Sequence, residues 1–221
     1  MAALVIETEG SIKVGDKNIE IDTAIREGSK LNIILAHGSS IDMHYSLMQK
    51  LFDALSAEYS VLRFNFSFVG GTDEQKMDFD KSKGELEACI RHMGSKDVVI
   101  VGKSLGGYIA TLFAGRKDLG VKGVISMGYP MHEMNRPNDI RHEFSHKHLE
   151  GASLPVEFII GDSDPMWNVK DTPPIFANYA IHVVPNANHS YNPVKPGVTK
   201  EENEEKVVNL VKQIVAKFAN K

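Results

Sequence analysis

The chain has little of several features that define whole classes of protein. It contains one cysteine, Cys89, in 221 residues, so no disulfide can form within it and we expect a reducing compartment. It has no apolar run near the roughly 20 residues that a membrane-spanning helix needs. Its first ten residues, MAALVIETEG, have no basic flank like that of a signal peptide. We therefore expect a cytoplasmic protein without a membrane partner.

An excess of basic charge is also missing. The formal net charge is −4 and the isoelectric point is about 6.1, so nucleic acid is not an expected partner. The hydrophobic share of 42% and the charged share of 24% are typical of a globular protein. We expect one domain, residues 1–221, with a core large enough to need neither metal nor disulfide. The oligomeric state stays open.

Short apolar runs alternate with amphipathic segments along most of the chain. Between the runs, apolar residues recur every three or four positions, as in Leu47, Leu51 and Leu55. Buried strands that alternate with such helices predict an α/β fold, in which a mostly parallel twisted sheet carries helices on both faces. Each apolar run ends in glycine, proline or polar turn residues, and the runs span residues 31–38, 60–66, 97–102, 121–128, 156–161 and 181–185.

Two other segments differ from this pattern. Residues 4–9 and 12–21 are rich in β-forming residues and are broken at Gly10-Ser11 and Gly15-Asp16, which predicts an antiparallel hairpin region before the parallel sheet. Residues 131–153 are long and polar, and we expect that they form a small cap over one edge of the sheet.

The stretch VIVGKSLGGYIA, residues 99–110, admits two motifs. Gly102-Lys103-Ser104 ends like a nucleotide-binding P-loop, but that motif needs a glycine where the chain has Asp97 and a loop where it has an apolar strand. A nucleophile elbow instead needs a buried strand, a serine on a sharp turn and a following helix. Gly102 and Gly106 are the small residues that such a turn requires. We predict that Ser104 is a nucleophile and that Lys103 faces solvent.

A serine nucleophile needs a base and an acid from later loops. His189 lies between the last expected strand and the last expected helix, and GDSDP after the strand at 156–161 offers Asp162 and Asp164. The chain order Ser, Asp, His fits an elbow-type triad. Asp162 directly follows the strand and is expected to cap the turn. Asp164 precedes Pro165, which favours an extended conformation, and is predicted to be the acid.

Backbone N–H groups are predicted to stabilise the oxyanion that forms during attack. One belongs to Leu105, directly after the nucleophile, and the other to Ser39 in the turn AHGSS after the first long strand. His37 in the same turn is expected to have a structural role. Four further residues are expected either to line an acyl pocket or, at least as readily, to belong to the ordinary core or its rim, namely Phe68, Tyr129, Met131 and Trp167.

Taken together, these motifs resemble the α/β-hydrolase superfamily, in particular its small dienelactone-hydrolase-like members with little or no lid. The resemblance rests on HGSS, LRFNF, GKSLGG, GYP, GDSDP and NHSY, which follow one another along most of the chain. It implies a sheet of eight strands or slightly fewer and a triad of Ser104, Asp164 and His189. It also implies hydrolysis of an ester or related acyl bond of a small molecule without a cofactor. Dienelactone hydrolases have a cysteine in place of Ser104, so their particular substrate is not carried over.

Two alternatives belong to other classes of protein. HEFSH at residues 142–146 fits the His-Glu-x-x-His pattern of zinc peptidases, which places two imidazoles on one face of a helix. The extended pattern needs glycine and histidine where the chain has Leu149 and Ala152, so no metal is expected. The second alternative is a binding module that shares the fold without catalysis. The complete Ser, Asp, His order argues against it.

Overall fold

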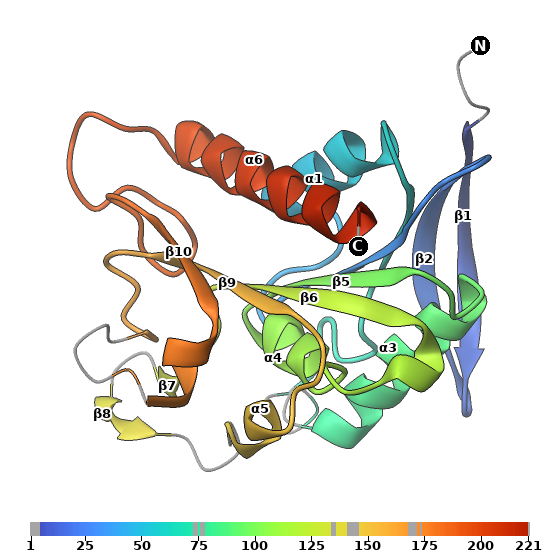
Figure 1. Ribbon diagram of the computed structural model, residues 1–221, viewed down its shortest axis with the longest axis horizontal. Helices are drawn as coiled ribbons and strands as arrows, with labels where there is room; N and C mark the ends of the chain where they lie inside the picture. The colour runs from blue at the N-terminus through green and yellow to red at the C-terminus, as the bar shows by residue number, and fades with distance from the viewer. Residues whose placement is uncertain are drawn as a thin grey trace.

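The computed structural model describes residues 5–72, 75, 78–133, 136–140, 146–167, 172 and 174–220. Its centre is an eight-stranded sheet in the order β1-β2-β4-β3-β5-β6-β9-β10, shown in Figure 1. The strands of this sheet are β1 (Val5–Val14), β2 (Lys17–Arg26), β3 (Asn32–Ala36), β4 (Ser60–Phe64), β5 (Val98–Lys103), β6 (Val121–Met127), β9 (Val156–Gly161) and β10 (Ala180–Val184).

The sheet begins with an antiparallel hairpin and continues as parallel strands. β1 pairs antiparallel with β2, β2 pairs antiparallel with β4, and the pairs from β4 through β3 to β10 are parallel. The predicted fold class is therefore confirmed. The predicted break at Gly10-Ser11 is wrong, because these residues pair with Ile21 and Glu20 and β1 continues through them. Pairing along the whole neighbouring strand outweighs the weak strand preference of one glycine.

Helices cover both faces of the sheet (Figure 1). One face carries α1 (Ser46–Ser56) and α6 (Lys200–Ala219), and the other carries α3 (Phe79–His92) and α4 (Leu105–Thr111). Side chains of a strand alternate between the faces, so in β5 Val98 and Ile100 pack toward α3 and α4. Val99 and Val101 pack toward α1 and α6. The same alternation places Lys103, the last residue of β5, on the side of α1 and α6.

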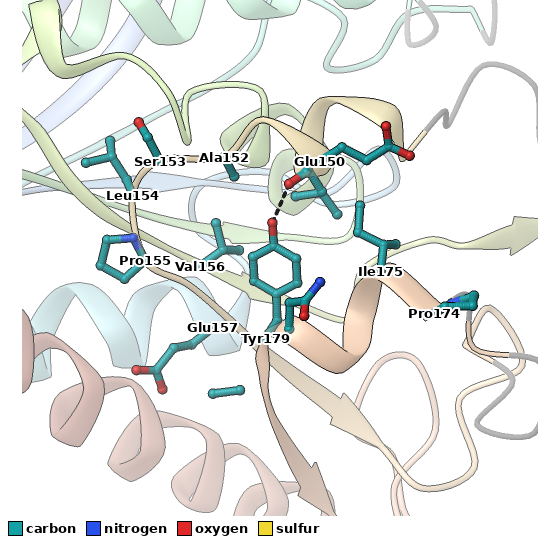
Figure 2. A pocket seen from close by; sticks show the side chains of 13 residues that line it. Glu150, Ala152, Ser153, Leu154, Pro155, Val156, Glu157, Pro174, Ile175 and Tyr179 are labelled. Carbon is teal, nitrogen blue, oxygen red and sulfur yellow. Dashed lines mark hydrogen bonds between the residues drawn. The ribbon is translucent and has the colours of Figure 1, made fainter.

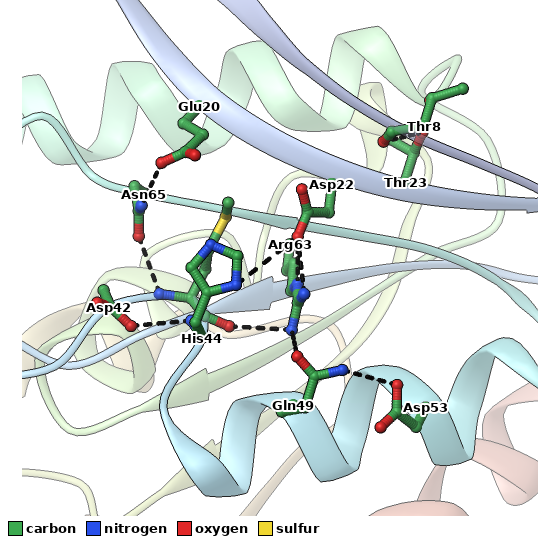
Figure 3. Close-up of polar contacts among 11 residues, drawn as sticks. Thr8, Glu20, Asp22, Thr23, Asp42, His44, Gln49, Asp53, Arg63 and Asn65 are labelled. Carbon is green, nitrogen blue, oxygen red and sulfur yellow. Dashed lines mark hydrogen bonds and ion pairs between the residues drawn. The ribbon is translucent and has the colours of Figure 1, made fainter.

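A buried ion pair joins the hairpin to this layered core, as Figure 3 shows. The Arg63 guanidinium on β4 donates to Asp22 Oδ2 on β2 from Nε at 2.8 Å and pairs with it from Nη2 at 2.7 Å. Arg63 also donates to Gln49 Oε1 on α1 at 2.6 Å and lies 4.5 Å from the centre of the Phe52 ring. These contacts tie together β2, β4 and α1, which follows the turn expected to supply an oxyanion donor.

The described part of residues 131–153 contains a small two-stranded sheet and a short helix. These are β7 (His132–Glu133), β8 (Arg136–Ile140) and α5 (Lys147–Glu150). Leu149 is buried, and His148 Nε2 lies 2.9 Å from Thr111 Oγ1, so this helix packs beside α4. Residues 134–135 and 141–145 lie outside the described part, and the cap stays a prediction.

Two short 3₁₀ helices, η1 (Lys117–Leu119) and η3 (Pro174–Asn178), complete the described elements. Of the helices that the structure describes, none combines the length and the apolar character needed to cross a membrane.

Candidate active site

Ser104 lies on a sharp turn between β5 and α4. Its backbone angles are φ 52° and ψ −117°, a conformation that costs free energy in any residue other than glycine. Hydrogen bonds hold both sides of the turn: the Ser104 N–H donates to the Met127 carbonyl at 2.8 Å, and the Ser104 carbonyl accepts from the Tyr108 N–H at 2.9 Å. The strained turn is the one that the sequence predicts.

The two glycines of the motif are needed because backbone segments approach each other closely. A Cβ on Gly102 would overlap the carbonyl of Gly106, and a Cβ on Gly106 would overlap the carbonyls of Ala36 and His37. The end of β3 and the start of α4 are therefore packed directly against each other. This contact brings the turn after β3 to the side of Ser104.

The structure brings Ser104, His189 and Asp164 together in one hydrogen-bonded chain. His189 Nε2 lies 2.9 Å from Ser104 Oγ, and His189 Nδ1 lies 2.9 Å and 3.1 Å from the two Asp164 oxygens. Asp164 is 4% exposed and also accepts from the Met166 N–H at 2.8 Å. An ionised carboxylate only accepts, so Nδ1 carries the imidazole proton and Nε2 is free to accept the serine proton.

Asp162 takes part in a different set of contacts. Its carboxylate accepts from the N–H groups of Asn186 at 2.9 Å and Ala187 at 3.2 Å, and from the Ser163 hydroxyl at 3.0 Å. The backbone hydrogen bond from Asn186 is the main reason that the pKa of Asp162 is lowered. Asp162 thus binds the beginning of the loop that carries His189 instead of the N–H groups of its own turn, which corrects its predicted capping role.

A buried asparagine on α6 holds the same loop and was not found by sequence reasoning. Asn203 Nδ2 donates to the carbonyls of Asn186 and Tyr191, both at 3.1 Å, on either side of His189. Asn203 is fully buried and lies four residues before Val207, at the start of the apolar stripe of α6. A polar residue within an apolar stripe is the signal that would have pointed to it.

His37 holds the turn after β3 in place. The Phe66 N–H donates to His37 Nε2 at 3.0 Å, so Nδ1 carries the proton and donates to the Gly38 carbonyl at 2.7 Å. Burial lowers the pKa of His37 to about 4, although its bond to Gly38 opposes the shift. The geometry matches the expected structural role of His37 and keeps its imidazole neutral.

The turn after β3 and the first turn of α4 contain the two N–H groups that are predicted to bind the oxyanion. A Cβ on Gly38 would lie 3.2 Å from Ser104 Cβ, so the residue before Ser39 is in close contact with Ser104. Within the described part of the chain, neither the Ser39 N–H nor the Leu105 N–H has an acceptor. Leu105 is also the first residue of α4, where N–H groups point out of the helix. Both N–H groups are therefore without an internal acceptor among the described residues, and their role as oxyanion donors stays a prediction.

The space next to Ser104 is small. A hollow of about 40 Å³ is lined by Gly38, Ser40, Ile41, Tyr45, Lys103, Ser104, His189 and Ser190. The four candidates for an acyl pocket, Phe68, Tyr129, Met131 and Trp167, are no more than 3% exposed and belong to the core between the sheet and α4. Of their two open alternatives, the core is the one that the structure supports.

A larger groove of about 830 Å³ lies elsewhere, as Figure 2 shows. Its walls include Val156 and Ala180, which begin β9 and β10, together with Tyr179, whose hydroxyl donates to the Leu149 carbonyl at 2.6 Å. Asp164 and His189 follow the opposite ends of these strands. The groove is therefore at the other edge of the sheet and contains none of the predicted site residues.

Lys103 does not face solvent, which corrects the prediction. The side chain is 4% exposed, and Nζ lies 5.5 Å from the centre of the Tyr191 ring. Burial lowers the pKa of Lys103 to about 8, opposed by the charge of Asp164. The pKa of His189 is lowered by burial and then by the charge of Lys103, while Asp164 raises it. The expectation failed because Lys103 continues the buried alternation of β5 toward α6.

The zinc alternative cannot be followed through the whole motif, because residues 141–145 lie outside the described part. His146 is described, and its Nδ1 lies 3.0 Å from the Tyr129 hydroxyl. Among the residues that the structure describes, no group of three His, Cys, Asp or Glu side chains has an arrangement that could hold a metal ion.

With this geometry established, comparison with known proteins identifies the family. Residues 29–218 match the model of the alpha/beta hydrolase domain. The chain belongs to the α/β-hydrolase family. This membership supports hydrolase activity in general, whereas no curated protein sequence matches the chain.

Solved structures share the fold of this α/β hydrolase at low sequence identity. Dienelactone hydrolase from Anabaena variabilis is 18% identical with a TM-score of 0.67, over 95% of this chain and 96% of the other. Est1E from Butyrivibrio proteoclasticus, solved with ferulic acid bound, is 14% identical with a TM-score of 0.74, over 96% and 100%. Proline iminopeptidase from Mycobacterium smegmatis is 14% identical with a TM-score of 0.70, over 96% and 99%.

Proposed function

We propose that this α/β hydrolase is a serine hydrolase that cleaves an ester or related acyl bond of a small molecule through an acyl-enzyme. The observation that carries the proposal is the unbroken hydrogen-bonded chain from Ser104 Oγ through His189 to Asp164. Such a chain provides a nucleophile, a base within reach of its proton, and a carboxylate that orients the base. We also propose a cytoplasmic location, supported by the single, buried and unpaired Cys89.

In the first half-reaction, Ser104 Oγ attacks the acyl carbon while its proton passes to His189 Nε2. The carbonyl oxygen becomes an oxyanion, and the N–H groups of Ser39 and Leu105 are assigned as its donors. When the tetrahedral intermediate collapses, the bond from carbon to the leaving oxygen breaks. His189 then gives its proton to that oxygen, and an alcohol departs.

The second half-reaction repeats these transfers with water. His189 Nε2 accepts a proton from water as the water oxygen attacks the acyl carbon of the ester on Ser104. Collapse of this intermediate breaks the bond to Ser104 Oγ, which regains its proton from His189. The product is a carboxylic acid. The Asp164 carboxylate accepts the hydrogen bond from His189 Nδ1 and stabilises the imidazolium that forms in each attack.

The electrostatic setting supports these roles. The pKa of His189 is lowered chiefly by burial, so the imidazole is neutral and able to accept a proton at pH 7. The first turn of α4 directs its N–H groups toward Ser104, which favours the negative charge that develops there. Because the hollow beside Ser104 is too small to enclose a whole substrate, the acyl bond is proposed to reach Ser104 from the protein surface.

Covalent labelling tests the proposal. A fluorophosphonate probe reacts with a serine that is activated by a neighbouring base, so it should label the wild type on Ser104, with no labelling of Ser104→Ala. The same two proteins are assayed with p-nitrophenyl esters of increasing acyl length, where only the wild type should turn over. Labelling that persists in Ser104→Ala would disprove the assignment of the nucleophile.

The same experiment separates the other classes of function. A folded wild type that is neither labelled nor active on any ester would support a binding module instead of an enzyme. Turnover that is lost with a strong chelator and restored by zinc would support the motif at residues 142–146. We expect chelation to leave the turnover unchanged.

A further inference from the structure

The ammonium of Lys103 lies in a space that the backbone keeps open for it. Gly128, directly after β6, has φ +56° and no side chain. A Cβ at Gly128 would lie 2.7 Å from Lys103 Nζ and 3.4 Å from His189 Cε1. Nζ and the imidazole carbon therefore border the same small space. A side chain at position 128 would displace Lys103 Nζ, whereas its contact with the imidazole would be an ordinary one.

The charged and titratable groups around Nζ come from several elements. The loop after β9 contributes Asp164, and the loop after β10 contributes His189 and Tyr191. Tyr45, directly before α1, accepts a hydrogen bond from Lys200 Nζ on α6 at 2.9 Å, and Glu204 on α6 pairs with Lys200 at 3.5 Å and with Lys50 on α1 at 3.0 Å. Tyr45 borders the same hollow as Lys103, but the charges of Lys50, Lys200 and Glu204 are paired with one another, while Asp164 and His189 face Lys103.

Lys103 has no carboxylate partner of its own. Within the described part of the chain, its Nζ makes neither a hydrogen bond nor an ion pair. The carboxylate that attracts it is Asp164, whose oxygens are already bonded to His189 Nδ1 and the Met166 N–H. A buried charge with so little compensation is costly, and its main electrostatic effect falls on the neighbouring imidazole.

We propose that Lys103 is a positioning residue for the hydrolysis, because its ammonium, held against Gly128 beside the His189 ring, keeps the imidazole in its neutral, proton-accepting form in mildly acidic solution. This proposal rests on the proposed function for its catalytic meaning. Its physical content, the electrostatic control of His189 by Lys103, is independent of any substrate.

Two consequences follow from like charges in close proximity. Protonation of His189 places a second positive charge beside Lys103, so the base becomes protonated only at a lower pH. Near pH 8 Lys103 loses its own proton, and the imidazolium that forms during attack is no longer opposed by it. The pH profile of kcat should therefore rise twice, once with deprotonation of His189 and again near pH 8.

An NMR titration of the His189 Cε1–H signal measures the effect without any turnover. The signal is assigned by its loss in His189→Gln, and the titration is run on the wild type and on Lys103→Met. Methionine is unbranched and similar in length to lysine but carries no charge. We expect Lys103→Met to raise the pKa of His189 by about one pH unit. The acid limb of kcat/KM should move by the same amount.

Lys122→Met is the matched control. Lys122 is partly exposed, pairs with Asp97 at 3.1 Å, and lies near the beginning of β6, at the opposite edge of the sheet. This variant loses the same charge without touching the site. Its His189 pKa should equal that of the wild type.

An unchanged His189 pKa in a folded Lys103→Met, or an equal rise in Lys122→Met, would overturn the proposal. If Lys103→Met does not fold, the NMR titration of the wild type tests the proposal. A second inflection in the His189 Cε1–H chemical shift near pH 8 would support the proposal, and a single inflection would overturn it. The two proposals fail separately. If Ser104 is never labelled but Lys103→Met raises the pKa of His189, the electrostatic control is supported and the proposed hydrolysis is contradicted.

Discussion

Replacing Asp164 by asparagine should remove most of the hydrolysis while leaving the fold intact. The amide has the same shape as the carboxylate, but its NH₂ group can donate to His189 Nδ1, which now lies 2.9 Å from Asp164 Oδ2. The imidazole proton then moves to Nε2, where it blocks acceptance of the Ser104 proton. The expected loss in kcat is about 10⁴-fold, as for a triad that is held in the wrong tautomer.

Asp162→Asn is the control, because it makes the same chemical change two residues away. Asp162 binds the backbone N–H groups of Asn186 and Ala187, and asparagine retains one oxygen to accept from them. The carboxylate is exposed, so water screens it and the loss of stability should be about 1 kcal/mol. For a chain of this size, that change lowers the melting temperature by about 2–4 °C.

Two measurements on each variant separate the effects. The turnover of a p-nitrophenyl ester reports the reaction, and a thermal melt followed by circular dichroism reports the fold. We expect Asp164→Asn to be nearly inactive and to melt close to the wild type, and Asp162→Asn to be active and slightly less stable. An inactive Asp162→Asn beside an active Asp164→Asn would show that the acid is assigned to the wrong residue.

Three further predictions concern stability, each measured by denaturant unfolding. Burial lowers the pKa of His37 from 6.5 to about 4, so between these pH values the unfolded state binds a proton on His37 that the folded state does not. The free energy of unfolding should therefore fall by up to about 3 kcal/mol as the pH is lowered from 6.5 to about 4. In His37→Gln it should depend less on pH over this range. Gly106→Ala should cost at least about 3 kcal/mol through backbone overlap, whereas Gly84→Ala, which meets open space within α3, should stabilise by about 0.5–1 kcal/mol. Arg63→Met should cost about 3–5 kcal/mol, because it removes the guanidinium and leaves the buried Asp22 carboxylate with only the exposed His44, 4.0 Å away, as a charge partner among the described residues. Asp22→Asn added to it should restore part of that loss, and equal stability of the single and double variants would contradict this reasoning.

The parallel part of the fold could be predicted because its signals are local and repeated. Every apolar run from residues 31–38 onward corresponds to a strand of the sheet, with bounds that differ by at most a few residues. The hairpin was predicted less well. Gly10 resembles a strand breaker in the sequence, yet it pairs with Ile21, and that partner is decided by register along β2 and not by the residues around Gly10.

The positions of Ser104, Asp164 and His189 could be predicted because the ends of parallel strands meet at one edge of the sheet, and each residue follows such an end. The loop that presents His189 could not be predicted in the same way. It depends on Asn203, which reaches it from α6, and on Tyr191, whose hydroxyl donates to the Ile159 carbonyl on β9. These contacts join segments that no periodicity relates, and they become visible only when the layers are packed.

The elbow places the side chain of Lys103, the residue before Ser104, close to His189. The residue before an elbow nucleophile ends a buried strand, and the strict alternation of β5 sends its side chain to the face opposite Gly102. On that face lie α6 and the loop with His189, so whatever occupies position 103 must contact the surroundings of the base. An apolar side chain there would only fill space. A lysine adds a charge that is buried and that water screens little. The effect of this charge on His189 depends on how β5, β6 and the loop with His189 pack together, so the GKSLG motif alone does not determine it.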